Sequence, residues 1–172
     1  MVAKGQRKVR SDAKKDVKST LPIELKDAIY RLAFLTNTPV MHVAELLFVH
    51  SIQNAEIIDR VVTQFQREVL LNGKLYRGTL SNPAVSKQKY DGQTDRIHFR
   101  LSRESYEILA VFAYALACSH SKACAVLLEE CIHESDFISN YVEQHLEDNV
   151  GDNYMNELRQ FMQYVNKGEE IH

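Results

Sequence analysis

The stretch DRIHFRLSRES, from Asp95 to Ser105, carries two structural signals in succession. Apolar and polar side chains alternate through its first part, as they do in a strand with one buried face. Ser102 then stands where a helix N-cap is expected, with Glu104 early in the helix that follows. Solvent exposure alone does not require two arginines and a histidine on one face, so we expect the outward face to bind something. The predicted inward set is Ile97, Phe99 and Leu101, and the outward set is Arg96, His98 and Arg100.

Apolar side chains at helical spacing predict three helices after this strand. The first begins after Ser102, the second covers SKACAVLLEECI at residues 121–132, and the third runs from about Ser135 to Leu146. A further amphipathic run, DNYMNELRQFMQYVNKG at residues 152–168, predicts a last helix. We expect that helix to dock onto the body of the protein, with a partner protein as the alternative.

The first half of the chain repeats this order at an offset of 80 residues. Few residues are identical, so the repeat rests on the shared order of strand, helix start and helices. A segment with three glycines and one proline, residues 72–94, separates the two copies and is expected to be a linker. By this alignment the first strand has Val17, Ser19 and Leu21 inward and Asp16, Lys18 and Thr20 outward.

A single short strand followed by helices has no neighbour for its backbone hydrogen bonds, and unpaired backbone groups are costly. Each strand must therefore pair with the other copy in the same chain or with a strand of a second molecule. The first choice gives an internal pseudo-dimer and the second a homo-oligomer. Either produces a two-stranded antiparallel ribbon over interlocked helices, with the outward side chains of both strands projecting from one face.

This order of strand, capped helix, turn and second helix resembles the ribbon-helix-helix superfamily of DNA-binding proteins. The second copy carries the resemblance in RIHFRLSRESYEIL and ACSHSKACAVLL, and the first in VKSTLPIELKDAIYRLAFLTNTPVMHVAELL. The match leaves out the third helices, the linker and the tail. It implies a mostly α fold of tandem ribbon-helix-helix units, each a short β-strand plus two helices, extended by additional C-terminal helices.

The resemblance also implies how double-stranded DNA would bind. In such proteins the ribbon enters the major groove, which is wide enough to admit it, and outward side chains meet base edges. Asp16 would repel phosphate, so the first copy is expected to read DNA more weakly. Transferred by position, the base-reading residues are Arg96, His98 and Arg100, with Lys18 and Thr20 as contacts from the first copy.

The start of the second helix is the other contact that the resemblance implies, because backbone N–H groups there can hold a phosphate. In the second copy this point carries Ser119, His120, Ser121 and Lys122, all of which can donate to phosphate. The corresponding residues of the first copy, Thr38 to His42, include a proline, a valine and a methionine and are poorer donors.

Charge is spread unevenly along the chain, although the formal net charge is -2. Residues 1–18 hold seven Lys or Arg against two Asp, whereas residues 129–172 hold eleven Asp or Glu against two Lys or Arg. A basic arm is therefore expected at the N-terminus, with Arg7, Lys8 and Arg10 following the DNA backbone or entering the minor groove. The expected units are the arm (1–15), a first ribbon-helix-helix unit (16–71), the linker (72–94), a second unit (95–148) and a C-terminal helix with an acidic tail (149–172).

Composition and motifs argue against several other classes. No apolar run approaches the roughly 20 residues of a membrane span, and the N-terminus lacks the apolar region of a secretory signal, so a cytoplasmic protein is expected. The three cysteines and nearby histidines fit no compact zinc spacing, and no common catalytic motif is present. We expect no cofactor, no metal and no enzymatic activity. Transcriptional repression is the commonest role of such proteins; plasmid partition, a relaxosome accessory role, and an interaction module or antitoxin remain alternatives.

Overall fold

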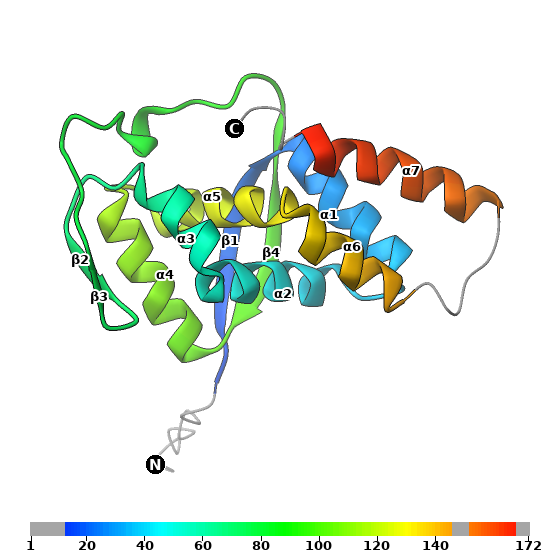
Figure 1. The fold of residues 1–172 in the computed structure, drawn as a ribbon, viewed down its shortest axis with the longest axis horizontal. Coiled ribbons are helices and arrows are strands. Elements are labelled where there is room, and N and C mark those ends of the chain that lie inside the picture. Colours follow the sequence, from blue (N-terminus) through cyan, green and yellow to red (C-terminus); the bar gives the residue numbers. More distant parts are fainter. Residues whose placement is uncertain (1–12, 146–151, 168–172) are drawn as a thin grey trace, which may run out of the picture.

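The computed structural model describes residues 13–145 and 152–167, which form seven α-helices, four strands and one 3-10 turn (Figure 1). A mostly helical chain with short antiparallel strands is thus confirmed. The order of elements is β1 (Lys15–Pro22), α1 (Ile23–Leu35), α2 (Val40–Gln53), α3 (Ala55–Val62), β2 (Val69–Leu71), β3 (Lys74–Tyr76), η1 (Val85–Lys87), β4 (Thr94–Leu101), α4 (Arg103–Ala115), α5 (His120–Ile132), α6 (Ser135–Glu143) and α7 (Asp152–Lys167).

Helices α1, α2 and α3 begin 80 residues before α4, α5 and α6. The turns that follow α1 and α4 also match, because each contains a residue with positive φ, Asn37 at 46° and Ala117 at 50°. The helix starts differ: Ser102 and Ser119 cap α4 and α5 through their hydroxyl oxygens, whereas α1 and α2 begin after prolines without a side-chain cap. Among the described residues no single helix is long and apolar enough to cross a membrane, and the pairs α1–α2 and α4–α5 reach that length only across bends of 109° and 98°.

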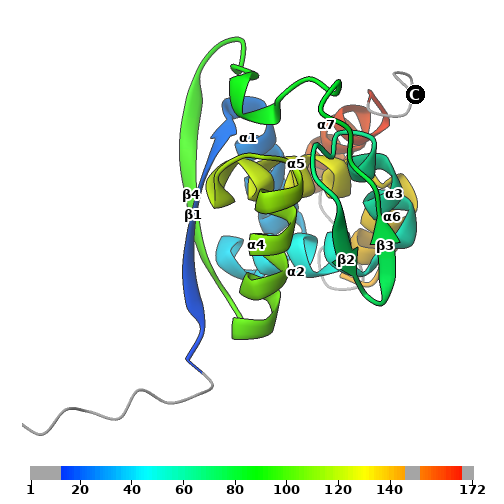
Figure 2. The same cartoon turned by 90° about the vertical axis from the view of Figure 1, so that its left-hand side faces the viewer.

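Strands β1 and β4 pair with each other within the chain and form an antiparallel two-stranded sheet, here called the ribbon. The register runs from Lys15 opposite Leu101 to Pro22 opposite Thr94. Figure 2 shows the ribbon on one side of the molecule with the helices on the other. The inward side chains are buried, including Val17 and Leu21 from β1 and Ile97, Phe99 and Leu101 from β4.

The two halves share one hydrophobic core and interlock across the ribbon. Helix α2 of the first half packs on β4, α5 of the second half packs on β1, and α2 and α5 pack on each other. The rings of Phe48 on α2 and Phe99 on β4 lie 6.5 Å apart. Ser19 fills the inward slot of β1 that matches Phe99 of β4, and its hydroxyl donates to the backbone oxygen of Ser121 on α5 at 2.8 Å. Neither half has a separate core.

A β-hairpin formed by β2 and β3 crosses the boundary expected between the first unit and the linker at residue 72, with β2 before the boundary and β3 after it. Asn72 and Gly73 make its two-residue turn with φ values of 51° and 77°, which is the preference of Asn-Gly hairpins. The sequence analysis missed this signal. Beyond the hairpin, Gly78 lies against the backbone of the segment that follows α3: a Cβ atom there would be 2.4 Å from the nitrogen of Arg67.

The last helix, α7, docks onto the body of the protein, as expected. It packs on α1 and α6 (Figure 1), with the side chains of Phe161 and Val165 fully buried. Phe161 is among the largest fully buried side chains of the described residues. Burial of such aromatic and aliphatic groups contributes roughly 1.5–3 kcal/mol each, so α7 adds to the stability of the fold.

We predict that Gly78→Ala lowers the free energy of unfolding by about 1–3 kcal/mol, because the added methyl group meets backbone that must move. Thermal unfolding followed by circular dichroism measures the effect as a melting temperature several degrees below that of the wild type. Arg77→Ala is the matched control, since the Arg77 side chain is 86% exposed and adjacent in sequence. Equal melting temperatures for both variants would contradict the close approach at Gly78.

Candidate nucleic-acid interface

Six side chains project from the centre of the ribbon on the side away from the helices, with the Pro22–Thr94 pair beyond them at one end, and we call the surface of these six the outer face. Three are permanent cations, one is a carboxylate, one is a histidine and one is a threonine. All are exposed except Thr20, which is half-buried. The outer face therefore unites the base-reading residues expected from sequence with Asp16. Its members are Asp16, Lys18 and Thr20 from β1 and Arg96, His98 and Arg100 from β4.

The register places an approximate twofold axis at the centre of the outer face. Lys18 lies directly opposite His98, and these two positions are also 80 residues apart. On one side of this central pair Thr20 faces Arg96, and on the other Asp16 faces Arg100. We call these the Thr20–Arg96 end and the Asp16–Arg100 end. They occupy equivalent places but carry different side chains.

At the Asp16–Arg100 end the carboxylate of β1 engages Arg100 and His98 of β4. Arg100 Nε donates to Asp16 Oδ1 at 2.9 Å, and His98 Nε2 lies 3.4 Å from the same oxygen. The hydrogen bond from Arg100 holds the pKa of Asp16 below its ordinary value. Exposed pairs of this kind contribute little to stability, so the main effect is to orient Arg100 and lower the net charge of this end.

At the Thr20–Arg96 end the arginine is unengaged. The guanidinium of Arg96 has no ion-pair or hydrogen-bond partner within residues 13–145 and 152–167. The nearby carboxylate of Asp95 accepts instead from Lys26 on α1, and this hydrogen bond lowers the pKa of Asp95. No described residue therefore competes with a ligand for the guanidinium donors of Arg96.

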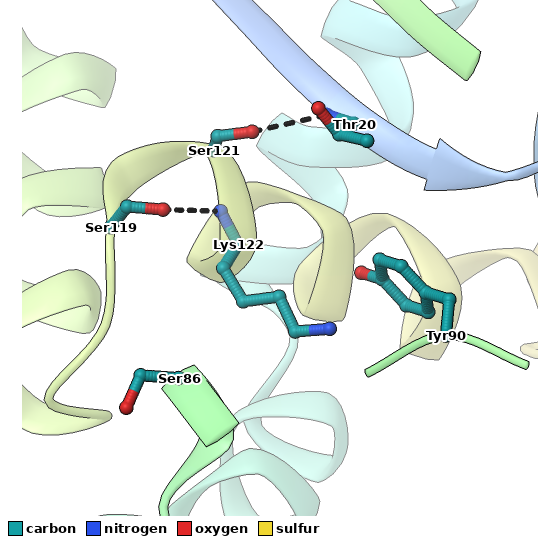
Figure 3. A pocket seen from close by; sticks show the side chains of 6 residues that line it. All are labelled: Thr20, Ser86, Tyr90, Ser119, Ser121 and Lys122. Carbon is teal, nitrogen blue, oxygen red and sulfur yellow. Dashed lines mark hydrogen bonds between the residues drawn. The ribbon is translucent and has the colours of Figure 1, made fainter. Parts of the chain in front are cut away.

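A pocket of 420 Å³ adjoins the Thr20–Arg96 end at the start of α5 (Figure 3). Thr20 belongs both to the outer face and to this pocket, and its backbone N–H donates to Ser121 Oγ at 3.0 Å. The hydroxyl oxygen of Ser119 accepts from the backbone of Lys122 at 3.2 Å, which caps α5. We call it the α5 pocket; it is lined by Thr20, Ser86, Tyr90, Ser119, Ser121 and Lys122.

The cation of the α5 pocket is held by an aromatic ring from the linker. Lys122 Nζ lies 3.4 Å from the centroid of the Tyr90 ring, and Figure 3 shows the two side chains converging. Partial burial lowers the pKa of Lys122 and raises that of Tyr90 to about 12. At neutral pH Tyr90 therefore keeps its proton. His120, the remaining residue of the expected phosphate site, does not line the pocket and stacks on Tyr106 with ring centroids 5.4 Å apart.

The start of α2 is the counterpart of this site at the Asp16–Arg100 end, and it is chemically poorer. Pro39 precedes the helix without a side-chain cap, and Met41 and His42 are exposed. Glu45 of the same helix bonds Lys14, the residue just before β1. No serine or lysine takes the place that Ser119, Ser121 and Lys122 hold on α5.

Two other groups of residues singled out in the sequence are the basic arm and the cysteines. Arg7, Lys8 and Arg10 of the basic arm lie outside the described residues. The cysteines lie within them, and burial raises the pKa of the Cys118 thiol to about 11 and that of Cys124 to about 12. In the described ranges no three His, Cys, Asp or Glu side chains are grouped as a metal ion would need.

Sequence reasoning placed Asp16 on the outward face but missed its ion pair with Arg100, and it did not find Ser86 or Tyr90. Asp16 was expected to repel phosphate, but its pairing with Arg100 follows only once the register of β1 against β4 is known. Ser86 and Tyr90 come from the linker, whose path over the start of α5 has no periodic signal. An antiparallel pairing centred on Lys18 and His98 would have predicted the first contact; no pattern would have predicted the other two.

Comparison of the chain with protein-family models, curated proteins and solved structures found no match in any of the three.

We predict that the pKa of Asp16 lies below its ordinary value of 3.8, because the guanidinium of Arg100 stabilises the ionised carboxylate. In Arg100→Ala this partner is gone, so the pKa of Asp16 should return toward 3.8. The pair is present above the lowered pKa and is lost as pH falls through it. NMR titration of the Asp16 carboxyl carbon measures this. Lys18→Ala, which removes a neighbouring cation that makes no contact with Asp16, should shift the value less. An unshifted pKa in the wild type would contradict the pairing.

Proposed function

We propose that this protein binds double-stranded DNA sequence-specifically, with the ribbon in the major groove, and acts as a transcriptional repressor. The observation that carries the proposal is the outer face itself. It is a narrow antiparallel ribbon that projects three permanent cations, a histidine and a threonine to one side, with its inward side chains sealed in the core.

The dimensions and chemistry of this face suit the major groove. A two-stranded ribbon fits the groove's width, and arginine can reach guanine O6 and N7 together. Arg96 has no partner among the described residues and is free to do so. Lys18 and His98 lie at the centre of the ribbon, where donors can reach base edges or the nearest phosphates.

The α5 pocket supports the same proposal, because it supplies a second contact at a fixed place beside the ribbon. The positive end of α5, the hydroxyl of Ser119 and the ammonium of Lys122 are the groups that bind a phosphate. Thr20 links the pocket to the outer face, so base and phosphate contacts would be held in one register. Phosphate contacts position a protein on DNA and base contacts give sequence preference.

Repression is the role that this mode of binding suggests. A protein seated in the major groove excludes other proteins from the same base pairs, and the ribbon-helix-helix resemblance points to operator binding. Plasmid partition or a relaxosome role would use the same DNA contacts. No feature of the described residues favours either.

We predict that Arg96→Ala weakens binding to a selected DNA site by about 1–3 kcal/mol and relaxes the preference at one base position. Selection of duplexes from a random pool, followed by fluorescence anisotropy on the enriched site, measures both effects. Arg103→Ala is the matched control, because Arg103 is equally charged and lies just beyond β4, where it bonds Glu107.

A failure of the wild type to enrich any duplex would overturn the proposal. Equal losses in the Arg96 and Arg103 variants would show that binding depends on general positive charge and would remove the outer face as the reading surface.

We also predict that in Lys122→Gln the fall of log K for DNA binding with log salt concentration becomes less steep by about 0.9, the value for one lost phosphate contact. The change should be the same for every DNA sequence, because phosphate contacts carry no sequence preference. Binding isotherms at several salt concentrations measure the slope. Lys74→Gln on β3 should leave it unchanged, since Lys74 lies on the hairpin and bonds Asp59. Identical slopes in wild type and Lys122→Gln would exclude the α5 pocket as a phosphate site.

A further inference from the structure

We infer that the DNA site of this protein is not an inverted repeat, and that the protein lies on it in one orientation only. This inference rests on the proposed function and adds to it the kind of DNA site that the protein recognises. It follows from differences between the two ends of the ribbon and between the helices beside them.

A ribbon built from two identical strands presents the same side chains to both halves of its site. Twofold symmetry in such a protein is matched by an inverted repeat in the DNA. Here the approximate twofold axis passes between Lys18 and His98, which already differ. The symmetry of the backbone is therefore not shared by the side chains that would touch DNA.

The two ends differ in charge and in available donors. At the Thr20–Arg96 end the guanidinium of Arg96, which has no partner among the described residues, lies opposite the hydroxyl of Thr20. Arginine favours guanine, and the threonine hydroxyl can donate or accept one hydrogen bond with a neighbouring base. At the Asp16–Arg100 end the guanidinium has one nitrogen committed to Asp16. The carboxylate there can accept from cytosine N4, so this end presents an acceptor and a donor to neighbouring bases. One inverted sequence cannot suit both ends equally.

The residues that lie beside the two ends of the outer face also differ. The α5 pocket, with Ser119, Ser121 and Lys122, adjoins the Thr20–Arg96 end, and the linker beside it adds the exposed cations Lys87 and Lys89. At the other end Lys14 is bonded to Glu45 on α2, and the start of α2 offers Met41 and His42. Lys15 is also exposed at that end, so the described groups that can meet phosphate differ in kind on the two sides of the central pair.

Turning the protein end for end on the same duplex would exchange all these contacts. A good bidentate base contact discriminates by about tenfold or more, and the α5 pocket adds to the difference. One orientation consequently dominates on a given site.

The test is a selection of duplexes from a random pool with the full chain and two variants. Asp16→Arg combined with Arg100→Thr gives both ends the same pair of side chains, arginine facing threonine. Asp16→Asn changes the net charge by the same single positive unit and leaves the ends unlike, so it is the matched control. These positions are exposed, and circular dichroism verifies that each variant is folded.

We expect an enriched motif without inverted symmetry from the wild type and from Asp16→Asn, and a motif with matching inverted halves from the double variant. An inverted repeat enriched by the wild type would overturn the inference and leave the proposed function standing. A double variant whose motif stays as unequal as that of the wild type would overturn the assignment of the asymmetry to the two ends of the ribbon. Enrichment of nothing by the wild type would instead refute the proposed function.

Orientation is measured separately with Gln88→Cys carrying an iron chelate that cleaves nearby DNA. Ser86 lines the α5 pocket and Gln88 is exposed two residues away, so a label at residue 88 reports the Thr20–Arg96 end. The Cys118 thiol has a pKa of about 11 and reacts slowly with the reagent at neutral pH. Cleavage confined to one side of the enriched motif is expected, and equal cleavage on both sides would overturn the single orientation.

Discussion

The backbone hydrogen bonding of two lone strands is the constraint from which the rest of the structure follows. Neither β1 nor β4 has a neighbouring strand in its own half of the chain, and an unpaired strand is costly. Their pairing across about 80 residues brings α2 against β4 and α5 against β1. One shared core results, and one face of the ribbon is left free because its opposite face carries that core.

Pairing unlike strands has a chemical consequence that a symmetric dimer would not show. Asp16 meets Arg100 and His98 across the ribbon, while Arg96 faces Thr20 and its guanidinium has no partner in the part of the chain that the structure describes. The α5 pocket strengthens the second end through Ser121, which bonds the backbone of Thr20. Because one chain encodes both strands at separate positions, a substitution at one end of the ribbon need not be repeated at the other.

Much of the fold was predictable because its signals are local. Alternation in RIHFRL predicts a strand with a buried face, and Ser102 caps its helix as expected. The hairpin of β2 and β3 was missed although its Asn-Gly turn is a local signal too. The path of the linker was not predictable, because Ser86 and Tyr90 reach α5 through contacts that no short-range pattern encodes.

Residue order alone was enough to establish the identity of the outward side chains, since alternation in a strand assigns every second residue to one face. The same order placed Ser119, Ser121 and Lys122 at the beginning of a helix. Which side chain stands opposite which depends on the register between strands far apart in sequence, and the register is set by packing of the shared core. For that reason the engagement of Arg100, the availability of Arg96 and the inequality of the two ends became visible only in the folded chain.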